Sequence, residues 1–452
     1  MTRRVVVVGA DAAGMSAASQ ALRRAGRDAL EVVAFERGQY TSYSACGIPY
    51  WVAGDVDGPD ALIARSAAEH QANGIDLRMR TEVTEIDLDA HTVTAEELDS
   101  DTGYQLRFDD LVLATGAVPI RPDLPGVDAP GVYGVQTLGD GTALLAGLAH
   151  RPRRAVVVGG GYIGVEMAEA MVRRGLQVTL VDRAPEPMTT LDPDVGALVH
   201  EAMQGMGITV RTGTPVSGFE TGPDGRVAAV LTEDGPLPTD LVVLGIGVRP
   251  ATELAGKAGL PLGEFGGVLT DRRMRVPDHA GVWAGGDCVE VLHRVSQCRV
   301  HIPLGTHANK HGRVIGTNLG GGYATFPGVV GTAVTKVCDL EVGRTGLLEA
   351  EARAAGFEPV SVTVRSTTRA GYFPGAMPIT VKLIAERGTG RLLGAQLVGR
   401  EGSAKRVDVC AVAVWHEMSV EQMTALDLGY APPFSPVWDP VLIAARKASD
   451  AV

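Results

Sequence analysis

The sequence predicts an α/β protein with two parallel-sheet units and a C-terminal α+β domain. β-Branched runs at 4–8 and 154–158 each lead into a glycine-rich turn and then a helical pattern, as expected of strands buried on both faces of a parallel sheet. Beyond about residue 326 the pattern changes to alternating strands, at 360–364 and 380–384, and then a helix from about 405 to 416. This change indicates a separate domain.

Composition limits the class of protein. The 452 residues exceed one ordinary domain, and 45% hydrophobic with 21% charged residues is typical of globular proteins. A net charge of -12 without a long basic run argues against a nucleic-acid partner. The chain enters a strand after only a few residues and has no apolar run long enough to span a bilayer. We therefore expect a cytoplasmic protein without a membrane partner.

The five cysteines, at 46, 288, 298, 338 and 410, show neither CxxC nor zinc-ligand spacing. This argues against a disulfide scaffold and against a metal site. For the last four we expect small buried apolar residues.

The turn after the strand at 154–158 is a complete GxGxxG pattern, Gly159 to Gly164. Its glycines permit a tight turn, close approach of a pyrophosphate and close packing of the following helix, so the unit is predicted to be a Rossmann-like dinucleotide-binding domain. Asp182 ends the next strand, where a carboxylate accepts hydrogen bonds from a ribose and repels a 2'-phosphate. This favours NADH, while the neighbouring Arg183 leaves NADPH open.

The turn after the strand at 4–8, Gly9 to Gly14, has Asp11 at the second glycine position. Glu36 at the end of the next strand and a later Gly-Gly-Asp turn at 285–287 favour a second dinucleotide, FAD, with Asp287 on its ribityl or linker hydroxyls. Strands ending at 116 and 247 mark the expected crossings between units. The predicted FAD-binding domain is thus 1–115 with 248–325, the NAD(P)H-binding domain is 116–247, and the interface domain is 326–452.

The segment 41–50 lies just after the first ribose-binding acid and contains Cys46. A cofactor at the carboxyl ends of the sheet would lie beside this cysteine. If a helix begins after Gly47, its dipole would stabilise a thiolate at Cys46.

These motifs together resemble the pyridine nucleotide-disulfide oxidoreductase superfamily, in particular its single-cysteine coenzyme A-disulfide reductase branch. The resemblance extends over nearly the whole chain. It rests on the segments 42–50, 114–116, 159–164 with Glu166, 285–287, 303–305 with 309–310, 370–372 and 430–435.

The resemblance implies a homodimer in which NAD(P)H reduces FAD and the flavin reduces a mixed disulfide of Cys46 with coenzyme A. It implies FAD contacts at Gly9, Ala13, Gly14, Glu36, Arg37, Ser42, Ala114, Thr115, Gly116, Gly286, Asp287, Pro303, Leu304 and Gly305. It implies NAD contacts at Gly159, Gly161, Tyr162, Ile163, Gly164, Glu166, Asp182 and Gly247. It further implies catalytic Tyr372 and Tyr430 from the partner subunit and substrate contacts at Ser16, Gln20, Arg23, Ser42 and Trp438.

The chain departs from the family pattern at four positions. Ala45 and Trp438 replace an asparagine and a lysine that help to hold coenzyme A, Ala12 replaces the histidine of peroxide-reducing members, and Trp51 replaces the second cysteine of a CxxxxC pair. Two alternatives therefore stay open: an NADH:acceptor flavoreductase acting on quinones or oxygen, in which Cys46 tunes the flavin, and a non-catalytic redox-sensing flavoprotein. His416 and Glu421 have the spacing of a glutathione-reductase acid-base pair, or His416 caps its helix.

Overall fold

The computed structural model describes residues 2–100 and 102–452. Its first large sheet has five parallel strands in the order β19-β7-β1-β2-β3. The strands are β1 (Arg3–Val8), β2 (Leu30–Glu36), β3 (Ile75–Met79), β7 (Asp110–Leu113) and β19 (Val282–Ala284). Because β19 pairs with β7, the chain returns to its first unit after residue 281, as the sequence predicts.

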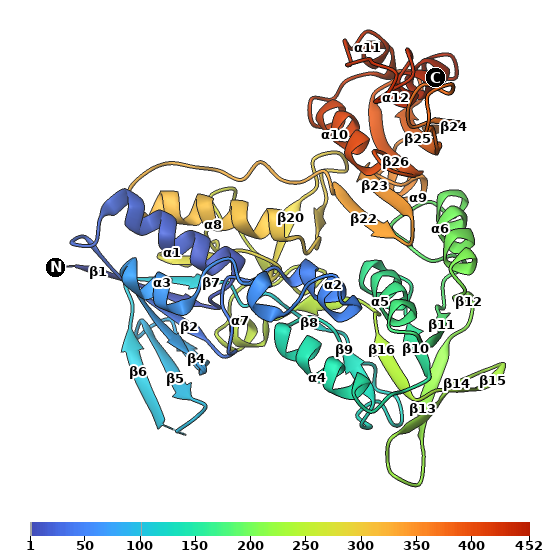
Figure 1. The fold of residues 1–452 in the computed structure, drawn as a ribbon. Coiled ribbons are helices and arrows are strands. Elements are labelled where there is room, and N and C mark those ends of the chain that lie inside the picture. Colours follow the sequence, from blue (N-terminus) through green and yellow to red (C-terminus); the bar gives the residue numbers. More distant parts are fainter. Residues whose placement is uncertain (1, 101) are drawn as a thin grey trace.

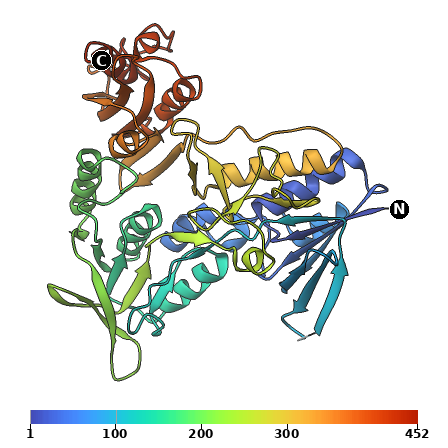
Figure 2. The same cartoon turned by 180° about the vertical axis from the view of Figure 1, so that it is seen from behind.

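Two long helices lie side by side over this sheet, α1 (Ala12–Ala25) and α8 (Gly305–Leu319) (Figures 1 and 2). Their closeness depends on glycine. A Cβ atom on Gly312 would lie 2.3 Å from the carbonyl oxygen of Ala13, and one on Gly316 would lie 2.4 Å from that of Ala17. Any side chain at these positions would push the helices apart.

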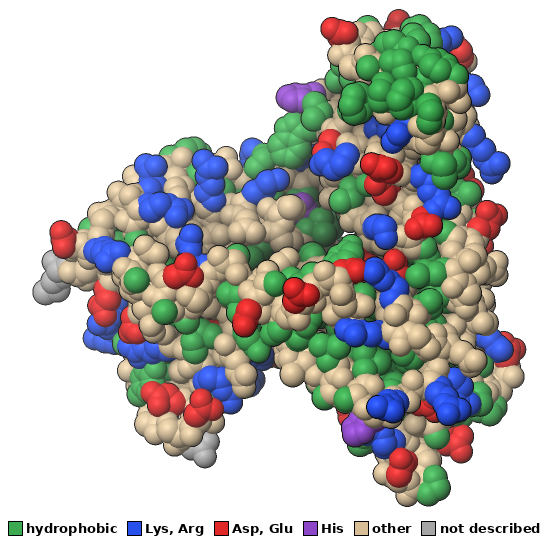
Figure 3. Space-filling view, viewed as in Figure 1, with side chains coloured by type: hydrophobic (Ala, Val, Ile, Leu, Met, Phe, Trp, Pro, Cys, Tyr) green, Lys and Arg blue, Asp and Glu red, His purple; other side chains and the backbone are tan. Residues whose placement is uncertain are grey.

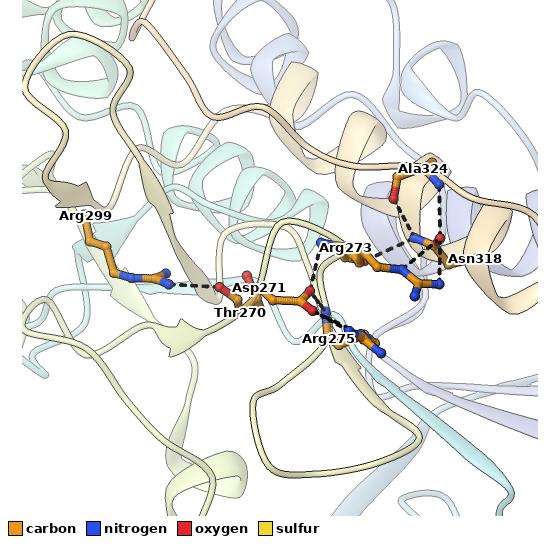
Figure 4. A network of polar contacts seen from close by, with 7 residues as sticks. All are labelled: Thr270, Asp271, Arg273, Arg275, Arg299, Asn318 and Ala324. Carbon is orange, nitrogen blue, oxygen red and sulfur yellow. Dashed lines mark hydrogen bonds and ion pairs between the residues drawn. The ribbon is translucent and has the colours of Figure 1, made fainter.

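Polar contacts fix the end of α8 to the loop before β19 (Figure 4). The Asn318 carboxamide oxygen accepts from Arg273 Nε at 3.3 Å and from the Ala324 amide at 3.1 Å. Asp271 accepts from Arg275 in the same loop. The far end of the helix is therefore anchored, while its N-terminus points toward the carboxyl ends of the strands.

The second large sheet has the parallel order β12-β11-β10-β16-β9. Its strands are β9 (Val132–Gly134), β10 (Arg154–Val158), β11 (Gln177–Val181), β12 (Thr209–Arg211) and β16 (Leu241–Leu244). Its helices are α4 (Leu138–Leu148), α5 (Tyr162–Arg173) and α6 (Pro193–Gly205). The strand-turn-helix order repeats that of the first sheet, which confirms the predicted pair of Rossmann-like units.

The C-terminal domain is built on an antiparallel sheet of order β22-β23-β26-β25-β24. Its strands are β22 (Ala333–Val337), β23 (Leu340–Gly346), β24 (Pro359–Thr367), β25 (Pro378–Glu386) and β26 (Leu392–Gly399). Its helices are α9 (Glu349–Ala354), η3 (Ala404–Arg406), α10 (Val407–Trp415), α11 (Val420–Thr424) and α12 (Pro440–Ser449). The predicted strands and helix are confirmed, and together with the parallel sheets they establish the expected fold class.

Smaller elements complete the fold. The short sheets are formed by β4 (Thr81–Asp87), β5 (Thr92–Glu97) and β6 (Thr102–Arg107); β13 (Val216–Thr221), β14 (Val227–Thr232) and β15 (Gly235–Pro238); β8 (Ala117–Pro119) and β17 (Val248–Pro250); and β18 (Val268–Leu269), β20 (Val289–Leu292) and β21 (Arg299–Val300). The short helices are η1 (Ala45–Gly47), α2 (Ile48–Ala53), η2 (Pro59–Leu62), α3 (Ala67–Ala72) and α7 (Glu253–Lys257). Within the described ranges, no helix combines the length and apolarity needed to cross a bilayer.

A buried lysine joins the second sheet's helices to the C-terminal domain. Lys382 on β25 is 3% exposed. Its Nζ lies 3.0 Å from Asp192, 2.6 Å from Asp194 and 2.8 Å from Glu349. Asp192 is the residue directly before α6, and its carboxylate also accepts from Gln396 at 2.7 Å. This cluster holds the start of α6 against the C-terminal sheet.

Candidate active site

Both glycine turns have the geometry that a dinucleotide requires. Gly9 and Gly159 have φ values of 96° and 101°. A Cβ atom at either would collide with the carbonyl oxygen of a neighbouring strand end, at 2.2 and 2.5 Å. Gly14 and Gly164 are equally constrained, because a Cβ atom there would lie 2.0 and 1.8 Å from the oxygen of the first glycine of the same turn. The last glycine of each turn therefore allows helix-on-strand packing.

The two predicted ribose-binding acids occupy equivalent places. Glu36 accepts from the Ala10 amide at 3.0 Å and from the Gly38 amide at 2.7 Å. Asp182 accepts from the amides of Gly160 and Ala184. Each carboxylate thus holds its own glycine turn, a role that the sequence motif alone does not reveal.

The turn at 285–287 closes the first site. Gly286 has φ of 86°, and its amide donates to Nδ1 of His311 at 3.1 Å. Burial is the main cause that lowers the pKa of His311 to about 3, so the ring stays neutral and its Nδ1 stays an acceptor. Burial also raises the pKa of Asp287 above its usual range. His311 is a residue that sequence reasoning missed.

One connected cavity of about 2550 Å³ contains both glycine turns and Cys46. A typical pocket for one ligand is about 300–1,000 Å³, so the space fits more than one dinucleotide-sized molecule. The predicted residues that line it are Gly9, Ala13, Ser16, Gln20, Arg23, Glu36, Arg37, Ser42, Cys46, Ala114, Thr115, Gly116, Gly159, Gly161, Tyr162, Ile163, Glu166, Asp182, Gly247, Gly286, Asp287, Pro303, Leu304 and Gly305. Turn geometry, paired acids and volume all fit FAD together with a nicotinamide dinucleotide.

Five predicted site residues do not line this cavity: Gly14, Gly164, Tyr372, Tyr430 and Trp438. The two glycines pack the helices of the turns, as described above. The three aromatic residues lie on the C-terminal domain, outside the lining of this cavity.

Cys46 lies in η1, directly before α2, and its side chain is exposed to the cavity. The helix expected after Gly47 is therefore confirmed. The NAD-side helices fix α2 from both flanks: Arg174 at the end of α5 donates to the Val52 carbonyl, and the indole of Trp51 packs against Gly141 of α4. Position 51, where other families place a second cysteine, serves here to pack the cysteine helix.

The groups of the chain around Cys46 do not favour its thiolate. Burial, followed by the carboxylates of Glu166 and Asp287, raises the pKa of the Cys46 thiol. This direction is opposite to the one expected from the helix start. Glu166 itself is held by Thr335, whose hydroxyl donates to it at 2.6 Å, and burial raises the pKa of its carboxyl.

Asp11 proves to be more than an interruption of the glycine pattern. Its carboxylate accepts from the Tyr43 amide at 3.2 Å and so connects the first glycine turn to the segment that leads to Cys46. Burial, supported by Glu36 and Asp287 and opposed by the Tyr43 amide, raises the pKa of Asp11 to about 6. Sequence reasoning offered no signal for this contact, because the two segments meet only in the fold.

The predicted substrate residues of α1 form a polar row facing the cavity. Ser16 Oγ lies 2.9 Å from Asn309 Oδ1, Gln20 donates to Thr317 at 3.1 Å, and Arg23 donates to Gln20 at 2.9 Å. Two further exposed arginines line the same cavity, Arg65 and Arg313. They were not predicted, and they extend the positive charge that Arg23 provides.

Tyr372, Tyr430 and Trp438 belong to an exposed apolar surface of the C-terminal domain. Its members are Tyr372, Met377, Tyr430, Phe434, Val437 and Trp438, between 40% and 78% exposed. A hydrogen bond joins the two tyrosines and raises the pKa of Tyr430. The Arg446 guanidinium stacks on the Trp438 ring at 4.8 Å. Figure 3 shows hydrophobic side chains gathered over this domain at the top of the molecule.

The remaining predicted residues behave as follows. Cys288, Cys338 and Cys410 are buried, as expected, whereas Cys298 is exposed. His416 is the C-cap of α10 and is exposed, which agrees with the capping role. Across residues 2–100 and 102–452 no group of three or more His, Cys, Asp or Glu side chains is arranged to hold a metal ion.

Comparison with known proteins places this geometry in a family. Residues 3–312 match the family model "Pyridine nucleotide-disulphide oxidoreductase", and residues 332–440 match that family's dimerisation domain. The NAD(P)H sulfur oxidoreductase (CoA-dependent) of Pyrococcus furiosus is 36% identical over 448 residues, which is 98% of each chain.

Solved structures of similar proteins agree with this family assignment. An NAD-dependent persulfide reductase from A. fulgidus is 38% identical, with a TM-score of 0.95 over 99% of this chain and 83% of that one. The water-forming NADH oxidase of Lactobacillus brevis, bound to NADH, is 29% identical, with a TM-score of 0.94 over 99% and 98% of the two chains. The paired glycine turns, the shared cavity and these matches lead to one conclusion: the chain belongs to the pyridine nucleotide-disulphide oxidoreductase family and is an FAD-dependent oxidoreductase that uses NAD(P)H.

Proposed function

We propose that this protein reduces a low-molecular-weight disulfide or persulfide, such as coenzyme A disulfide, with electrons from NADH. The observation that supports this best is the position of Cys46: its thiol opens into the cavity that contains both dinucleotide turns. It is also the only cysteine lining that cavity in the described part of the chain.

The role of each residue follows from the chemistry of disulfide exchange. The Cys46 thiolate attacks one sulfur of the substrate, which forms a mixed disulfide and releases the first thiol. FAD held at the Gly9–Gly14 turn and the 285–287 turn would supply the two electrons, taken from NADH, with which the mixed disulfide is cleaved. The second thiol then leaves, and Cys46 is regenerated. Tyr372 of the partner subunit and Tyr430 of the partner subunit supply the hydroxyls that exchange protons with the sulfurs.

Charge at the cavity supports a polyanionic substrate. Arg23, Arg65 and Arg313 are exposed at its lining, and guanidinium groups bind phosphates with two parallel hydrogen bonds. The proposal includes the predicted domain limits, the homodimer and the cytoplasmic location.

Replacing Cys46 with serine tests the proposal. We expect Cys46→Ser to bind FAD and to accept hydride from NADH, but to lose at least about 1,000-fold of its turnover with coenzyme A disulfide, because a hydroxyl is a far weaker nucleophile than a thiolate. Steady-state NADH oxidation measures this, and the flavin absorption of the variant reports correct folding. Cys298→Ser, which removes the other exposed cysteine, is the matched control. Undiminished turnover of Cys46→Ser would refute the cysteine's role.

The second candidate is an NADH:acceptor reductase acting on oxygen or a quinone. The structural likeness to a water-forming NADH oxidase favours it, as does Trp438 at the position of a substrate-binding lysine. Under this alternative, Cys46→Ser keeps rapid NADH-dependent reduction of a quinone or of oxygen. A redox-sensing role without catalysis would show stable reduced flavin and negligible turnover with every acceptor.

A further inference from the structure

A buried histidine contacts the segment that leads to Cys46. His70 lies on α3, is 2% exposed, and has its Nε2 2.8 Å from Ser42 Oγ. A capping box between Ser66 and Glu69 fixes the start of α3. Both His70 and Ser42 line the cavity into which Cys46 opens. The pair and the cysteine therefore face the same space.

The backbone at Ser42 is strained and held from several sides. Its φ of 50° falls in the left-handed region, which residues other than glycine rarely adopt. The Ser42 carbonyl accepts from the Ala64 amide at 2.8 Å, and the next amide donates to Asp11. Such a conformation persists only where the surrounding structure enforces it. The point at which the Ser42 side chain leaves the backbone is thus set by the fold, and the hydroxyl itself is held by His70.

The hydrogen-bonding partners determine which ring nitrogen of His70 bears the hydrogen. Burial, with the charge of Arg65, lowers the pKa of His70, so the neutral ring has one N–H and one acceptor. Nδ1 is buried and has no hydrogen-bond partner among the described residues. Because a buried N–H without a partner is rarer than a buried acceptor without one, the hydrogen lies on Nε2. Nε2–H then donates to Ser42 Oγ. The hydrogen of the Ser42 hydroxyl takes no part in this contact and can be donated to another acceptor.

We propose that His70 is a positioning residue that fixes the Ser42 hydroxyl as a hydrogen-bond donor to an amide carbonyl of the disulfide substrate. The inference rests on the proposed function and specifies which disulfides the site prefers. Ser42 and Cys46 lie four residues apart in the chain and line the same cavity, and under this proposal the hydroxyl contacts the part of the substrate next to the sulfur. Disulfides with an amide near the sulfur are then preferred over substrates without one, because sulfur atoms are weak acceptors.

The test compares two substrates in the holoenzyme: coenzyme A disulfide, whose arms contain amides, and diethyl disulfide, whose arms contain no hydrogen-bonding group. We expect His70→Phe to raise KM for coenzyme A disulfide about 3- to 10-fold, the usual effect of one lost hydrogen bond, with kcat within about twofold. KM for the second substrate stays at the wild-type value. His70→Asn keeps a donor and recovers most of the lost affinity.

A double-mutant cycle identifies the route of the effect. In a Ser42→Ala background, His70→Phe should add nothing further to KM, because the hydroxyl that it positions is gone. Glu69→Ala, which opens the capping box of the same helix, is the matched control and should keep the wild-type KM. Additive effects of the two replacements, or an equal effect of Glu69→Ala, would overturn the inference. Retention of disulfide turnover by Cys46→Ser would instead overturn the proposed function.

Discussion

At the residue scale, single carboxylates in this protein have two tasks: they organise the backbone around them, and their charge selects what binds next to them. Glu36 and Asp182 each hold the amide of a glycine turn, and each lies where a ribose is expected. Asp11 accepts from the segment before Cys46. A negative charge that organises backbone in this way also selects what binds next to it, because like charges repel across a short distance. The consequence is sharpest for the choice between NADH and NADPH.

Neutralising Asp182 tests that consequence. Asp182→Asn keeps an oxygen for the glycine-turn amide but removes the charge that would repel a 2'-phosphate. We expect the ratio of kcat/KM for NADPH to that for NADH to rise about tenfold, assisted by Arg183, which also lines the cavity. Steady-state kinetics with both cofactors measures the ratio. Asp240→Asn, an acid outside the cavity lining, is the control; an unchanged ratio in Asp182→Asn would contradict the assignment.

At the scale of elements, the site depends on helices held from a distance. α2, which follows Cys46, is fixed by Arg174 of α5 and by Gly141 of α4, and α6 is fixed to the C-terminal sheet through Lys382. The cysteine therefore belongs to one Rossmann-like unit but is positioned by the other. Loss of a contact between elements is expected to affect stability before it affects chemistry.

Removing the charge of Lys382 leaves Asp192 and Asp194 without this cation and leaves Glu349 with Arg353 alone. We expect Lys382→Met to lower the free energy of unfolding by about 3 kcal/mol, because a buried charge cluster loses its compensating partner. Denaturant unfolding of the FAD-bound protein measures it. Asp194→Asn is the control: that acid is 52% exposed in its side chain, and its loss should cost less than about 1 kcal/mol. Equal losses of unfolding free energy in the two variants would show that the buried charge cluster is not the source of the stabilisation.

The same cluster predicts an acid dependence of stability. Burial alone would raise the pKa of Glu349, but hydrogen bonds from Lys382, Ser361 and Arg353 lower it to about 2, from an ordinary value of 4.5. Since the folded-state pKa is depressed, the stabilisation is complete above about pH 4.5 and is lost as the pH falls toward 2. Glu349→Gln should flatten the decrease of unfolding free energy between pH 5 and 3. If the unfolding free energies of the variant and the wild type fell in parallel with pH, Glu349 would not be the source of the acid dependence.

At the scale of the whole molecule, the predicted site residues lie in two separate places on the chain. The cavity contains the dinucleotide turns and Cys46, but Tyr372, Tyr430 and Trp438 lie on the apolar surface of the C-terminal domain. That domain matches a dimerisation domain. An apolar surface of several large side chains is typical of an interface that is buried in the assembly. Disulfide reduction should therefore depend on the association of two subunits.

A charge placed on this apolar surface tests whether disulfide reduction depends on the association of two subunits. Phe434 is 75% exposed, and we expect Phe434→Asp to shift the protein toward monomers and to reduce disulfide turnover at low protein concentration, with recovery as concentration rises. Analytical ultracentrifugation and activity measured over the same range check both. Phe265→Asp, at a residue 52% exposed in the first unit, is the control. A dissociated but fully active variant would exclude a partner's contribution to the site.

The sequence by itself determined the strands, both glycine turns, the acids that follow them and the cysteine segment. Each of these is a local signal, in which a few consecutive residues specify a backbone conformation: Gly9 and Gly159 do so through the positive φ that only a missing Cβ allows without cost. The change of pattern near residue 326 was likewise visible, because strand alternation has a period of two.

Only the tertiary structure decided how these segments cooperate. Asp11 meets Tyr43, His70 meets Ser42, Arg174 meets Val52 and Lys382 meets Asp192 across separations that no local pattern encodes. The direction of the pKa shift at Cys46 was also out of reach, because it comes from burial and from the carboxylates of Glu166 and Asp287 in distant segments. Local propensity sets the elements, and contacts between elements set the electrostatics of the site.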